Sequence, residues 1–503
     1  MRQSFSTMHA SIKATLFLGF TALILGTSWM AMSADEKPRG PGGNRRDQRP
    51  PDAPVDDVRY LFKTEVPAHP LDVVLGRPTK NSVAASVLAY TDREGLILYG
   101  PKAGAPTEKT AAFALKAGQP TEVSVVGLQP DTQYFYRLNT REGDGPWAAE
   151  PERSFHTQRA PGRSFVFTVQ ADPHLDYNTE PPVYLRSLAN ALADGPDFHI
   201  DLGDTFMVDK HRGRETASAQ YVAQRYYFGR IAHTAPLFLV LGNHDGESGR
   251  WLDGTGDNMA VWSNTQRKRF FPNPVPDSFY TGNATKDPQA GLLQDYYAWE
   301  WGDALFVVLD PFWFTTRQRG GDDNWSRTLG REQYEWLTTT LTKSRAKFRF
   351  VFLHHLVGGL GKDARGGAEA ALLYEWGGRN PDGTMAFQEK RPGWPMPIHE
   401  LLAKNHVNIV FHGHDHIYAK QDLDGIVYQE VPQPGHPLGG TRSAEEYGYK
   451  GPVFGSSGHL RVTVSPEQTT VEYVRAVVPG ITRTELANAT VEQRYAITPQ
   501  GLK

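Results

Sequence analysis

The sequence predicts an all-β sandwich followed by a larger α/β domain, in which layered sheets are flanked by helices. Two changes of pattern along the chain indicate this division. In residues 58–157, short segments alternate apolar and polar residues and are separated by turn residues, as in antiparallel strands. In residues 163–503, continuous apolar runs alternate with segments of helical period. Such runs are typical of strands that are buried on both faces, so this second part is expected to be a layered α/β domain.

Composition narrows the possible functions. The chain has 503 residues, a formal net charge of −3 and 39% hydrophobic residues. This composition does not indicate a strongly basic surface, so nucleic acid is not specifically implied as a partner. It contains no cysteine, which excludes disulfides, thiolate metal ligands and cysteine nucleophiles. Any metal must therefore be bound through nitrogen and oxygen atoms.

The N-terminal segment has the pattern of a signal peptide. Arg2 and Lys13 precede an apolar run over residues 14–25, and small residues follow it, so we predict a signal peptide over residues 1–33. The run is short for a membrane span, which favours cleavage and export over an uncleaved anchor. Residues 34–57 are rich in Pro, Gly and Arg and are expected to be a disordered linker. The mature protein is then periplasmic or secreted and has no membrane span.

The first folded region shows a recognisable turn. Segments 82–90, 95–99 and 121–126 alternate in the manner of half-buried strands. The run over residues 128–137 resembles the tyrosine corner of fibronectin type III domains, in which Tyr134 would bond to nearby backbone. Residues 58–157 are therefore expected to form a fibronectin III-like β-sandwich.

The second region alternates strands and helices. Its predicted buried strands are 164–170, 197–202, 236–241, 348–353 and 407–411. Its predicted helices are 183–193, 219–233, 331–344 and 397–405. Gly302 and Asp303 are expected to form the turn of a hairpin, and residues 246–293 form a polar insertion of weak periodicity. Segments 459–464 and 470–475 close the chain as β-structure.

Each predicted buried strand ends in polar residues of one kind. They are Asp172 and His174, then Asp204, then Asn243, His244 and Asp245, then His354 and His355, and last His412, His414 and His416. Each set alone has an ordinary explanation, such as a helix cap, a turn or a core histidine. Five such sets in chain order favour a shared site, because ligands of α/β sheets bind at the carboxyl ends of the strands.

These residues resemble the five signature blocks of the calcineurin-like metallophosphoesterase superfamily. The blocks read Asp172-x-His174, Gly203-Asp204, Gly242-Asn243-His244-Asp245, a strand-terminal histidine, and Gly413-His414-x-His416. The resemblance covers residues 163–503 and implies a layered β-sandwich flanked by helices. A fibronectin III-like domain in front is similar to the arrangement in purple acid phosphatases.

The resemblance implies a binuclear metal centre. One metal would be held by Asp172, His174 and His416, the second by Asn243, His354 and His414, and both by Asp204. Oxygen and imidazole ligands suit Fe, Zn or Mn. Two such ions would lower the pKa of a bridging water, whose hydroxide attacks the phosphorus of a small phosphate ester. His244 would protonate the leaving oxygen or stabilise the phosphoryl charge.

The implied function is that of an exported metal-dependent phosphoric ester hydrolase, either a phosphatase or a phosphodiesterase. The alternative is an exported binding protein that has lost catalysis on the same scaffold. That alternative is weakened because every ligand position and His244 carry competent residues. The sequence does not separate monoesters from diesters.

Two positions depart from the pattern of the superfamily. Met207 stands where purple acid phosphatases have a tyrosine that ligates iron, so no purple colour is expected. Some relatives have an aspartate there that orients the catalytic histidine. Since Met207 cannot do this, either Asp245 or Asp209 is the candidate for the residue that orients His244. Leu356 replaces a common proline two residues after the histidine of the fourth block.

That replacement leaves a choice between neighbouring histidines in the fourth block. Either His354 or His355 would be the ligand, and His354 is favoured. His412 and Asp176 are expected to be structural. Substrate contacts are expected from insertions 246–293, 310–327 and 356–397.

Overall fold

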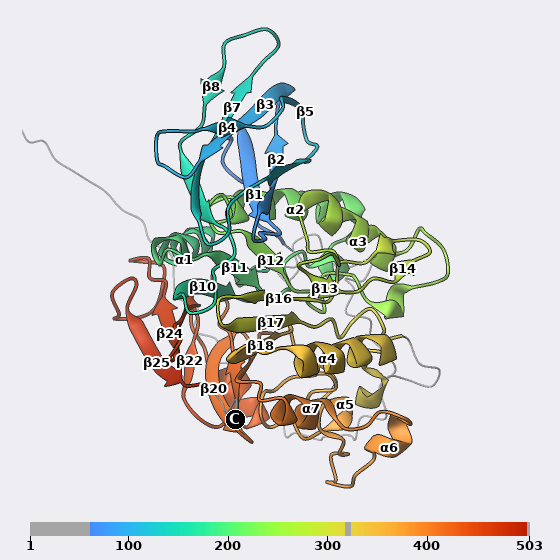
Figure 1. Cartoon of the computed structure of the whole chain (residues 1–503). Helices are drawn as coiled ribbons and strands as arrows, with labels where there is room; N and C mark the ends of the chain where they lie inside the picture. Colours follow the sequence, from blue (N-terminus) through green and yellow to red (C-terminus); the bar gives the residue numbers. More distant parts are fainter. Residues whose placement is uncertain (1–60, 317–322, 500–503) are drawn as a thin grey trace, which may run out of the picture. The chain divides into compact units, whose positions relative to one another are not determined.

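The computed structural model describes residues 61–316 and 323–499 (Figure 1). The predicted signal peptide and linker lie outside the described residues. Within the described ranges, no helix is long and apolar enough to cross a membrane. The predicted mixed α/β class is confirmed, since several large sheets combine with few helices.

The N-terminal region is a two-sheet β-sandwich. One side is formed by β1 (Leu71–Gly76), β2 (Ser82–Ala89) and β6 (Thr121–Val126). The other is formed by β3 (Arg93–Gly100), β4 (Glu108–Lys109), β5 (Phe113–Leu115), β7 (Gln133–Arg141), β8 (Ala148–Ala149) and β9 (Arg153–His156). The tyrosine-corner contact is present, because the backbone N–H of Gln129 donates to the Tyr134 hydroxyl at 2.9 Å.

Two large sheets follow. The first, of nine strands in the order β25-β24-β23-β10-β11-β12-β1-β2-β6, adds β10 (Phe165–Gln170), β11 (Phe198–Asp201), β12 (Leu237–Leu239), β23 (Gly458–Val464), β24 (Thr469–Arg475) and β25 (Val491–Ile497). The second, of eight strands, contains β13 (Thr281–Gly282), β16 (Tyr297–Trp301), β17 (Ala304–Val308), β18 (Phe348–Phe352), β19 (Ile409–His412), β21 (Ile426–Glu430), β20 (Ile417–Leu423) and β22 (Val453–Gly455), in that spatial order. A separate ribbon pairs β14 (Lys286–Asp287) with β15 (Gly291–Leu292).

An aromatic core fills the space between the two large sheets. Phe167 and Phe198 from the first sheet pack with Trp299, Phe306 and Phe350 from the second, all fully or almost fully buried. Alternate residues of these strands point away from this core and contact helices, which explains why the strands are apolar on both faces.

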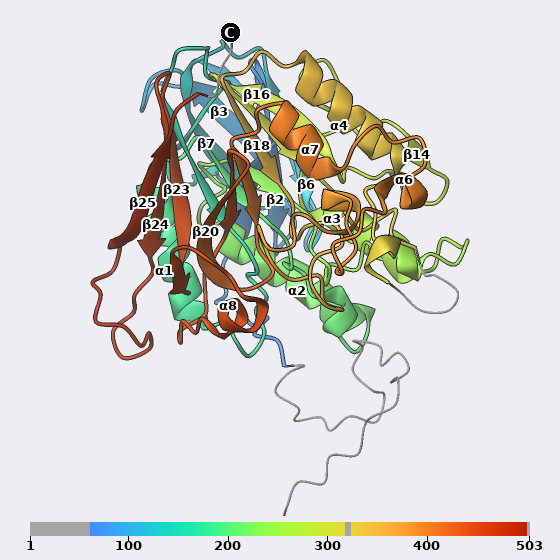
Figure 2. The same cartoon turned by 90° about the horizontal axis from the view of Figure 1, so that it is seen from below.

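Helices cover the outer faces of both sheets (Figures 1 and 2). Those packed on the first sheet are α1 (Pro181–Ala193), α2 (Arg214–Phe228) and α3 (Met259–Phe270). Those packed on the second are α4 (Arg331–Lys343), α5 (Tyr374–Gly377), α6 (Phe387–Lys390) and α7 (Ile398–Lys404). The short elements α8 (Arg442–Tyr447), η2 (Val208–Lys210), η3 (Gly249–Trp251) and η4 (Asn324–Ser326) lie in the connections.

The β-sandwich shares a sheet with the α/β region, which the sequence did not predict. β1 pairs in parallel with β12 through Gly76 and Leu237. At the same position Gly76 lies against Pro272, where a Cβ atom would be 2.6 Å from Cγ of the proline. The fully buried Arg225 of α2 also donates to the backbone oxygen of Ser86 at 2.9 Å.

Helix boundaries differ from expectation in two places. α2 begins and ends five residues earlier than predicted, because the chain after Phe228 continues as tight turns, in which the N–H groups of Arg230 and Ile231 donate to the carbonyls of Tyr227 and Phe228. α3 lies in the insertion that was expected to be irregular. Its periodicity is hidden because Ser263, Asn264 and Arg267 are buried polar residues on its inward side.

Candidate metal centre

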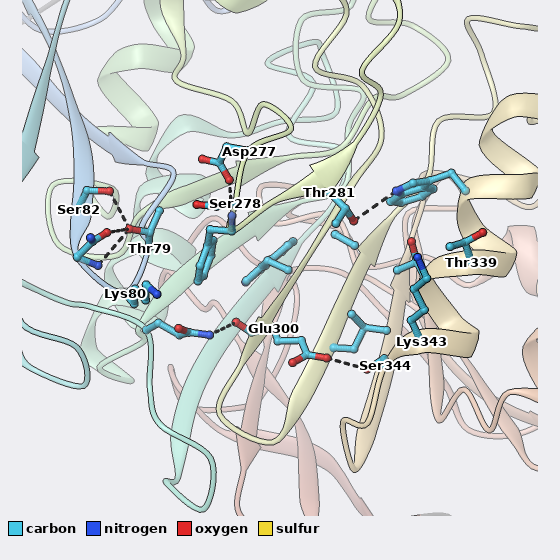
Figure 3. A pocket seen from close by; sticks show the side chains of 18 residues that line it. Thr79, Lys80, Ser82, Asp277, Ser278, Thr281, Glu300, Thr339, Lys343 and Ser344 are labelled. Atoms are coloured by element: carbon cyan, nitrogen blue, oxygen red, sulfur yellow. Dashed lines mark hydrogen bonds between the residues drawn. The ribbon is translucent and has the colours of Figure 1, made fainter.

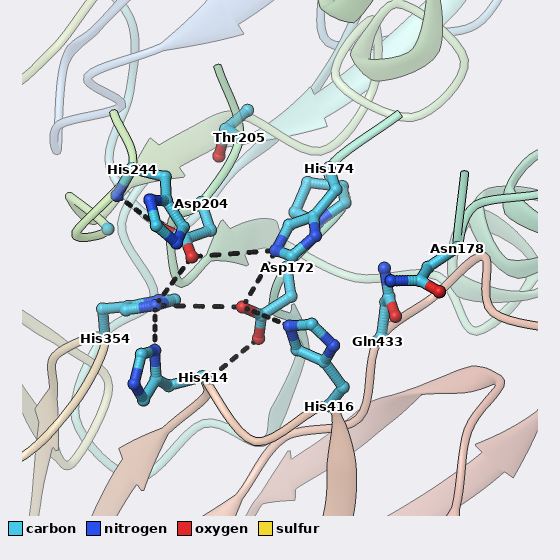
Figure 4. Close-up of polar contacts among 12 residues, drawn as sticks. Asp172, His174, Asn178, Asp204, Thr205, His244, His354, His414, His416 and Gln433 are labelled. Atoms are coloured by element: carbon cyan, nitrogen blue, oxygen red, sulfur yellow. Dashed lines mark hydrogen bonds and ion pairs between the residues drawn. The ribbon is translucent and has the colours of Figure 1, made fainter. Parts of the chain in front are cut away.

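The polar ends of five strands converge at one edge of the two sheets (Figure 4). The loop after β19 meets the loop after β10, since the His414 N–H donates to Oδ2 of Asp172 at 2.9 Å. The loop after β11 meets that after β18, where Oδ2 of Asp204 lies 3.3 Å from Nε2 of His354. The structure thus brings the loops after β10, β11, β18 and β19 together.

The first group of possible metal ligands contains Asp172, His174 and His416. Their ligand atoms all lie within 4.8 Å of one another. Nε2 of His174 and Nε2 of His416 are each 3.4 Å from Oδ1 of Asp172. Asp176 holds the other ring nitrogen of His174 at 3.2 Å, so it orients this ring from behind.

The second group contains Asp204, His354 and His414, again within 4.8 Å. Nδ1 of His354 donates to the carbonyl of Leu202 at 2.9 Å, and Nε2 of His414 donates to that of Asp363 at 2.7 Å. A carbonyl can only accept, so each remaining ring nitrogen can offer a lone pair to the centre. These two nitrogens lie 3.2 Å apart.

Asp204 lies between the two groups. Its Oδ2 is 3.3 Å from His354 and 3.7 Å from Nε2 of His174. Its Oδ1 accepts the backbone N–H of His244 at 2.8 Å, which fixes the carboxylate. Oδ2 of Asp204 therefore faces a histidine of each group.

The residues present fit two transition-metal ions. Oδ1 of Asp172, Nε2 of His174 and Oδ1 of Asn243 are buried and have no hydrogen-bond partner. Buried polar atoms in folded proteins are nearly always paired, so three unpaired atoms at one place fit ligands of a bound cation. Carboxylate oxygens, imidazole nitrogens and the side-chain amide oxygen of asparagine are ligands that suit Zn, Fe or Mn.

Electrostatics hold the carboxylate ligands and His414 in the protonation states that bind a metal. For His354, in contrast, burial is outweighed by Asp204 and Asp172, which raise the pKa to about 9, so a bound metal would displace the proton of that ring. Burial alone would raise the pKa of Asp172, but the charges of His416 and His354 outweigh it and hold that pKa well below its usual value. The pKa of Asp204 is likewise lowered, against burial, by His354 and His244. Burial lowers the pKa of His414 well below its usual value, so this ring is neutral and can ligate.

The structure distinguishes the two alternatives for the partner of His244. Nδ1 of His244 lies 3.0 Å from both carboxylate oxygens of Asp209. Asp209 reaches this position because Met207 adopts a left-handed conformation, with φ of 47°, at the start of η2. Some relatives carry an aspartate at the position of Met207. In this protein Asp209, two residues later in the chain, makes the contact with His244.

Asp245 has a different role. Its carboxylate is buried and accepts backbone N–H groups from Gly242 at 2.8 Å, Asp204 at 3.1 Å, Thr205 at 2.8 Å and Phe206 at 2.7 Å. It therefore ties the loop after β12 to the loop after β11 and does not contact the His244 ring.

Motif glycines allow these loops to approach closely. A Cβ atom on Gly242 would lie 2.0 Å from the backbone nitrogen of Asp204, and one on Gly413 would lie 2.8 Å from Oδ2 of Asp172. His414 and His416 have left-handed backbones, with φ of 84° and 60°. Such strain in non-glycine residues is typical of functional sites.

Two neighbouring histidines lie outside both groups. Nδ1 of His355 donates to the carbonyl of Leu356 at 2.9 Å, and its ring centroid is 5.0 Å from that of His414. Nδ1 of His412 pairs with Oε2 of Glu430 at 2.5 Å. His354, not His355, therefore occupies the inward position.

A cavity of about 600 Å³ lies elsewhere, between residues 79–82, β16 and α4 (Figure 3). Its carboxylates are engaged, because Asp277 accepts two backbone N–H groups and Glu300 accepts from Ser344. None of the predicted ligands lines it. The metal centre is therefore not part of this cavity.

Comparisons with known proteins agree with the site. The family model described as calcineurin-like phosphoesterase matches residues 165–418, just over half of the chain. The chain belongs to the calcineurin-like phosphoesterase family. No curated protein matches its sequence.

Two solved structures resemble the fold of this calcineurin-like phosphoesterase. The structure of PhoD matches with a TM-score of 0.60 and 16% identity, covering 85% of this chain and 90% of PhoD. A purple acid phosphatase from seeds of yellow lupin (Lupinus luteus) matches with a TM-score of 0.55 and 16% identity, covering 85% of this chain and 74% of that protein. At this identity the likeness establishes the fold.

Proposed function

We propose that this calcineurin-like phosphoesterase is an exported, binuclear metal-dependent hydrolase of small phosphate mono- or diesters. The observation that carries the proposal is the convergence of two ligand groups around Asp204, with His244 beside them. Export is supported by the signal-peptide pattern of residues 1–33.

The ligand sets follow from the two groups. One metal would be held by Asp172, His174 and His416, the other by Asn243, His354 and His414, and Asp204 would contact both. When bound, two such ions supply Lewis acidity, which lowers the pKa of water and neutralises charge on a phosphate. Their identity would be Fe, Zn or Mn.

His244 is placed to act on the ester. Asp209 engages Nδ1, so Nε2 is the nitrogen available to a substrate. A protonated ring held in this way can donate a hydrogen bond to a phosphoryl oxygen and transfer its proton to the leaving oxygen. The backbone N–H of the same residue anchors Asp204, so the histidine and the carboxylate are positioned together.

The centre is open on one side. The side chains of His416 and His244 are 27% and 18% exposed, while those of His174 and His354 are at most 5% exposed. The ester therefore approaches over His416 and His244. The buried remainder excludes water from the ligands, which strengthens electrostatic interactions with the phosphate.

The test combines metal analysis with hydrolysis. The purified protein is expected to contain about two transition-metal ions per chain and to hydrolyse p-nitrophenyl phosphate or bis(p-nitrophenyl) phosphate. EDTA should abolish this activity, and Fe, Zn or Mn should restore it. Metal content near zero would contradict the proposed centre. Two bound metals without any hydrolysis would favour the binding-protein alternative.

A further inference from the structure

Two loops outside the motif blocks pack together beside the metal centre. They are residues 176–179, which follow β10, and residues 432–438, which follow β21. The Glu180 N–H donates to the Gly435 carbonyl at 2.8 Å, and Nε2 of Gln433 lies 3.5 Å from Oγ1 of Thr179. A Cβ atom on Gly435 would lie only 2.7 Å from Cγ2 of Thr179. The two loops thus form one wall, which we call the 176/433 wall.

This wall borders the open side of the centre. Ser456 accepts the Gln433 N–H at 3.1 Å and donates to the His416 carbonyl at 2.5 Å, so it links the wall to the exposed ligand position. Figure 4 shows Asn178 and Gln433 on the His416 side of the centre, away from His244. An ester whose phosphate lies between His244 and His416 would extend its organic group along this wall.

The wall contains one buried polar atom without a hydrogen-bond partner and a histidine whose second ring nitrogen can donate. Gln433 is fully buried, and its Oε1 has no hydrogen-bond partner. Nδ1 of His436 accepts the Leu438 N–H at 3.1 Å, so Nε2 carries the proton of the neutral ring and can donate. The ring of His436 is near enough to His416, Asp176 and His174 to interact electrostatically with them.

The charge of the wall restricts what it can bind. Neither loop contains Lys or Arg. The neighbouring Lys63 is already bonded to the Thr179 carbonyl at 2.7 Å and to Glu180 at 2.8 Å. The carboxylate of Asp176 is paired with Nδ1 of His174. A second phosphate would find no counter-charge here, whereas hydroxyl groups would find both donors and an acceptor.

We propose that the 176/433 wall is a subsite for an uncharged, hydroxyl-bearing organic group of a phosphate monoester, such as a polyol or sugar. Asn178, Gln433 and His436 are its specificity-determining residues. This inference rests on the proposed phosphoesterase function and adds its substrate class.

The test compares two esters that differ only in hydroxyl groups, glycerol 3-phosphate and propyl phosphate. The wild-type protein should show a higher kcat/KM for glycerol 3-phosphate, by about five- to tenfold for each hydrogen bond formed. Asn178→Ala and His436→Phe should each lower the ratio of the two kcat/KM values toward one. His436→Gln keeps an N–H donor and should retain most of the preference.

A binding measurement separates recognition from turnover. Calorimetry with 3,4-dihydroxybutylphosphonate and butylphosphonate, which are not hydrolysed, should show the same preference and the same loss in His436→Phe. Equal kcat/KM for both esters in the wild-type protein would overturn the subsite while leaving the phosphoesterase function intact. An equal fall for both esters in His436→Phe would also overturn it, since the wall would then be merely structural. Hydrolysis of neither ester, nor of the p-nitrophenyl esters, would instead reject the proposed function, and the subsite with it.

Discussion

The contact between Asp209 and His244 is the feature of this site that departs most from the expected pattern, and it gives a quantitative prediction. Asp209→Asn removes one negative charge but keeps an oxygen that can accept from Nδ1 of His244. Both carboxylate oxygens lie 3.0 Å from that nitrogen, and the side chains of Asp209 and His244 are 7% and 18% exposed. A hydrogen bond to a charged group in such a setting contributes about 1.5–3 kcal/mol.

The expected loss follows from this value. If about 2 kcal/mol of stabilisation of the protonated ring is lost in the transition state, kcat falls about 30-fold. The loss should be large for propyl phosphate, because an alkoxide leaves poorly without a proton. It should be at most about threefold for p-nitrophenyl phosphate, whose leaving group needs little protonation. Steady-state kinetics with both esters, together with metal analysis, measures this difference.

The control is Asp257→Asn, which also removes a negative charge but from a side chain that is 84% exposed. It should leave both rates as in the wild-type protein. An unchanged kcat for propyl phosphate in Asp209→Asn would refute the reasoning. Equal losses for both esters, accompanied by loss of metal, would show that Asp209 supports the centre and not the proton donor.

Three further predictions follow from the buried polar groups. Asp204→Asn should lower metal content below two ions per chain and reduce activity at least about 100-fold, as measured by elemental analysis and hydrolysis. Burial raises the pKa of Asp201 to about 7, so between about pH 4 and 7 the folded protein holds a proton that the unfolded chain releases. Its stability therefore falls as pH rises through this range, and urea unfolding at several pH values should show a flatter slope for Asp201→Asn. Arg267→Met should destabilise the protein by about 3–5 kcal/mol in thermal or urea unfolding, because it leaves the carboxylate of Glu247 buried without its partner; a cost below about 1 kcal/mol would contradict the structural role of this pair.

The strands that carry the site could be predicted from the sequence because their signals are local. The run that forms β10 is mostly apolar and ends two residues before Asp172, and the run that forms β19 ends two residues before His414. β10 and β19 lie in different sheets, but the parallel strands of both sheets present their carboxyl ends at the same edge of the layered domain, so polar residues at those ends meet even though they are 242 residues apart. The motif positions therefore predict a common site from the sequence alone.

Elements that depend on buried polar partners could not be predicted in the same way. α3 was missed because its inward face carries Arg267 and Asn264, which bond to Glu247. Hydrophobic periodicity detects only apolar faces. The continuous sheet from β12 to β1 was also missed, because a single backbone pairing at Gly76 leaves no pattern in side-chain type.

The sequence by itself determined the fold class, the five polar strand ends and the absence of thiolate ligands. The tertiary structure alone decided which side chain meets which. In the structure Asp209 contacts Nδ1 of His244, whereas Asp245 accepts hydrogen bonds from backbone N–H groups, although the sequence left both as candidates for the partner of His244. The tertiary structure also placed His436 near His416, from a loop that carries no family motif. The physical reason is that strand ends follow from local periodicity, whereas side-chain pairing depends on backbone conformations, such as the left-handed Met207, that only the assembled loops impose.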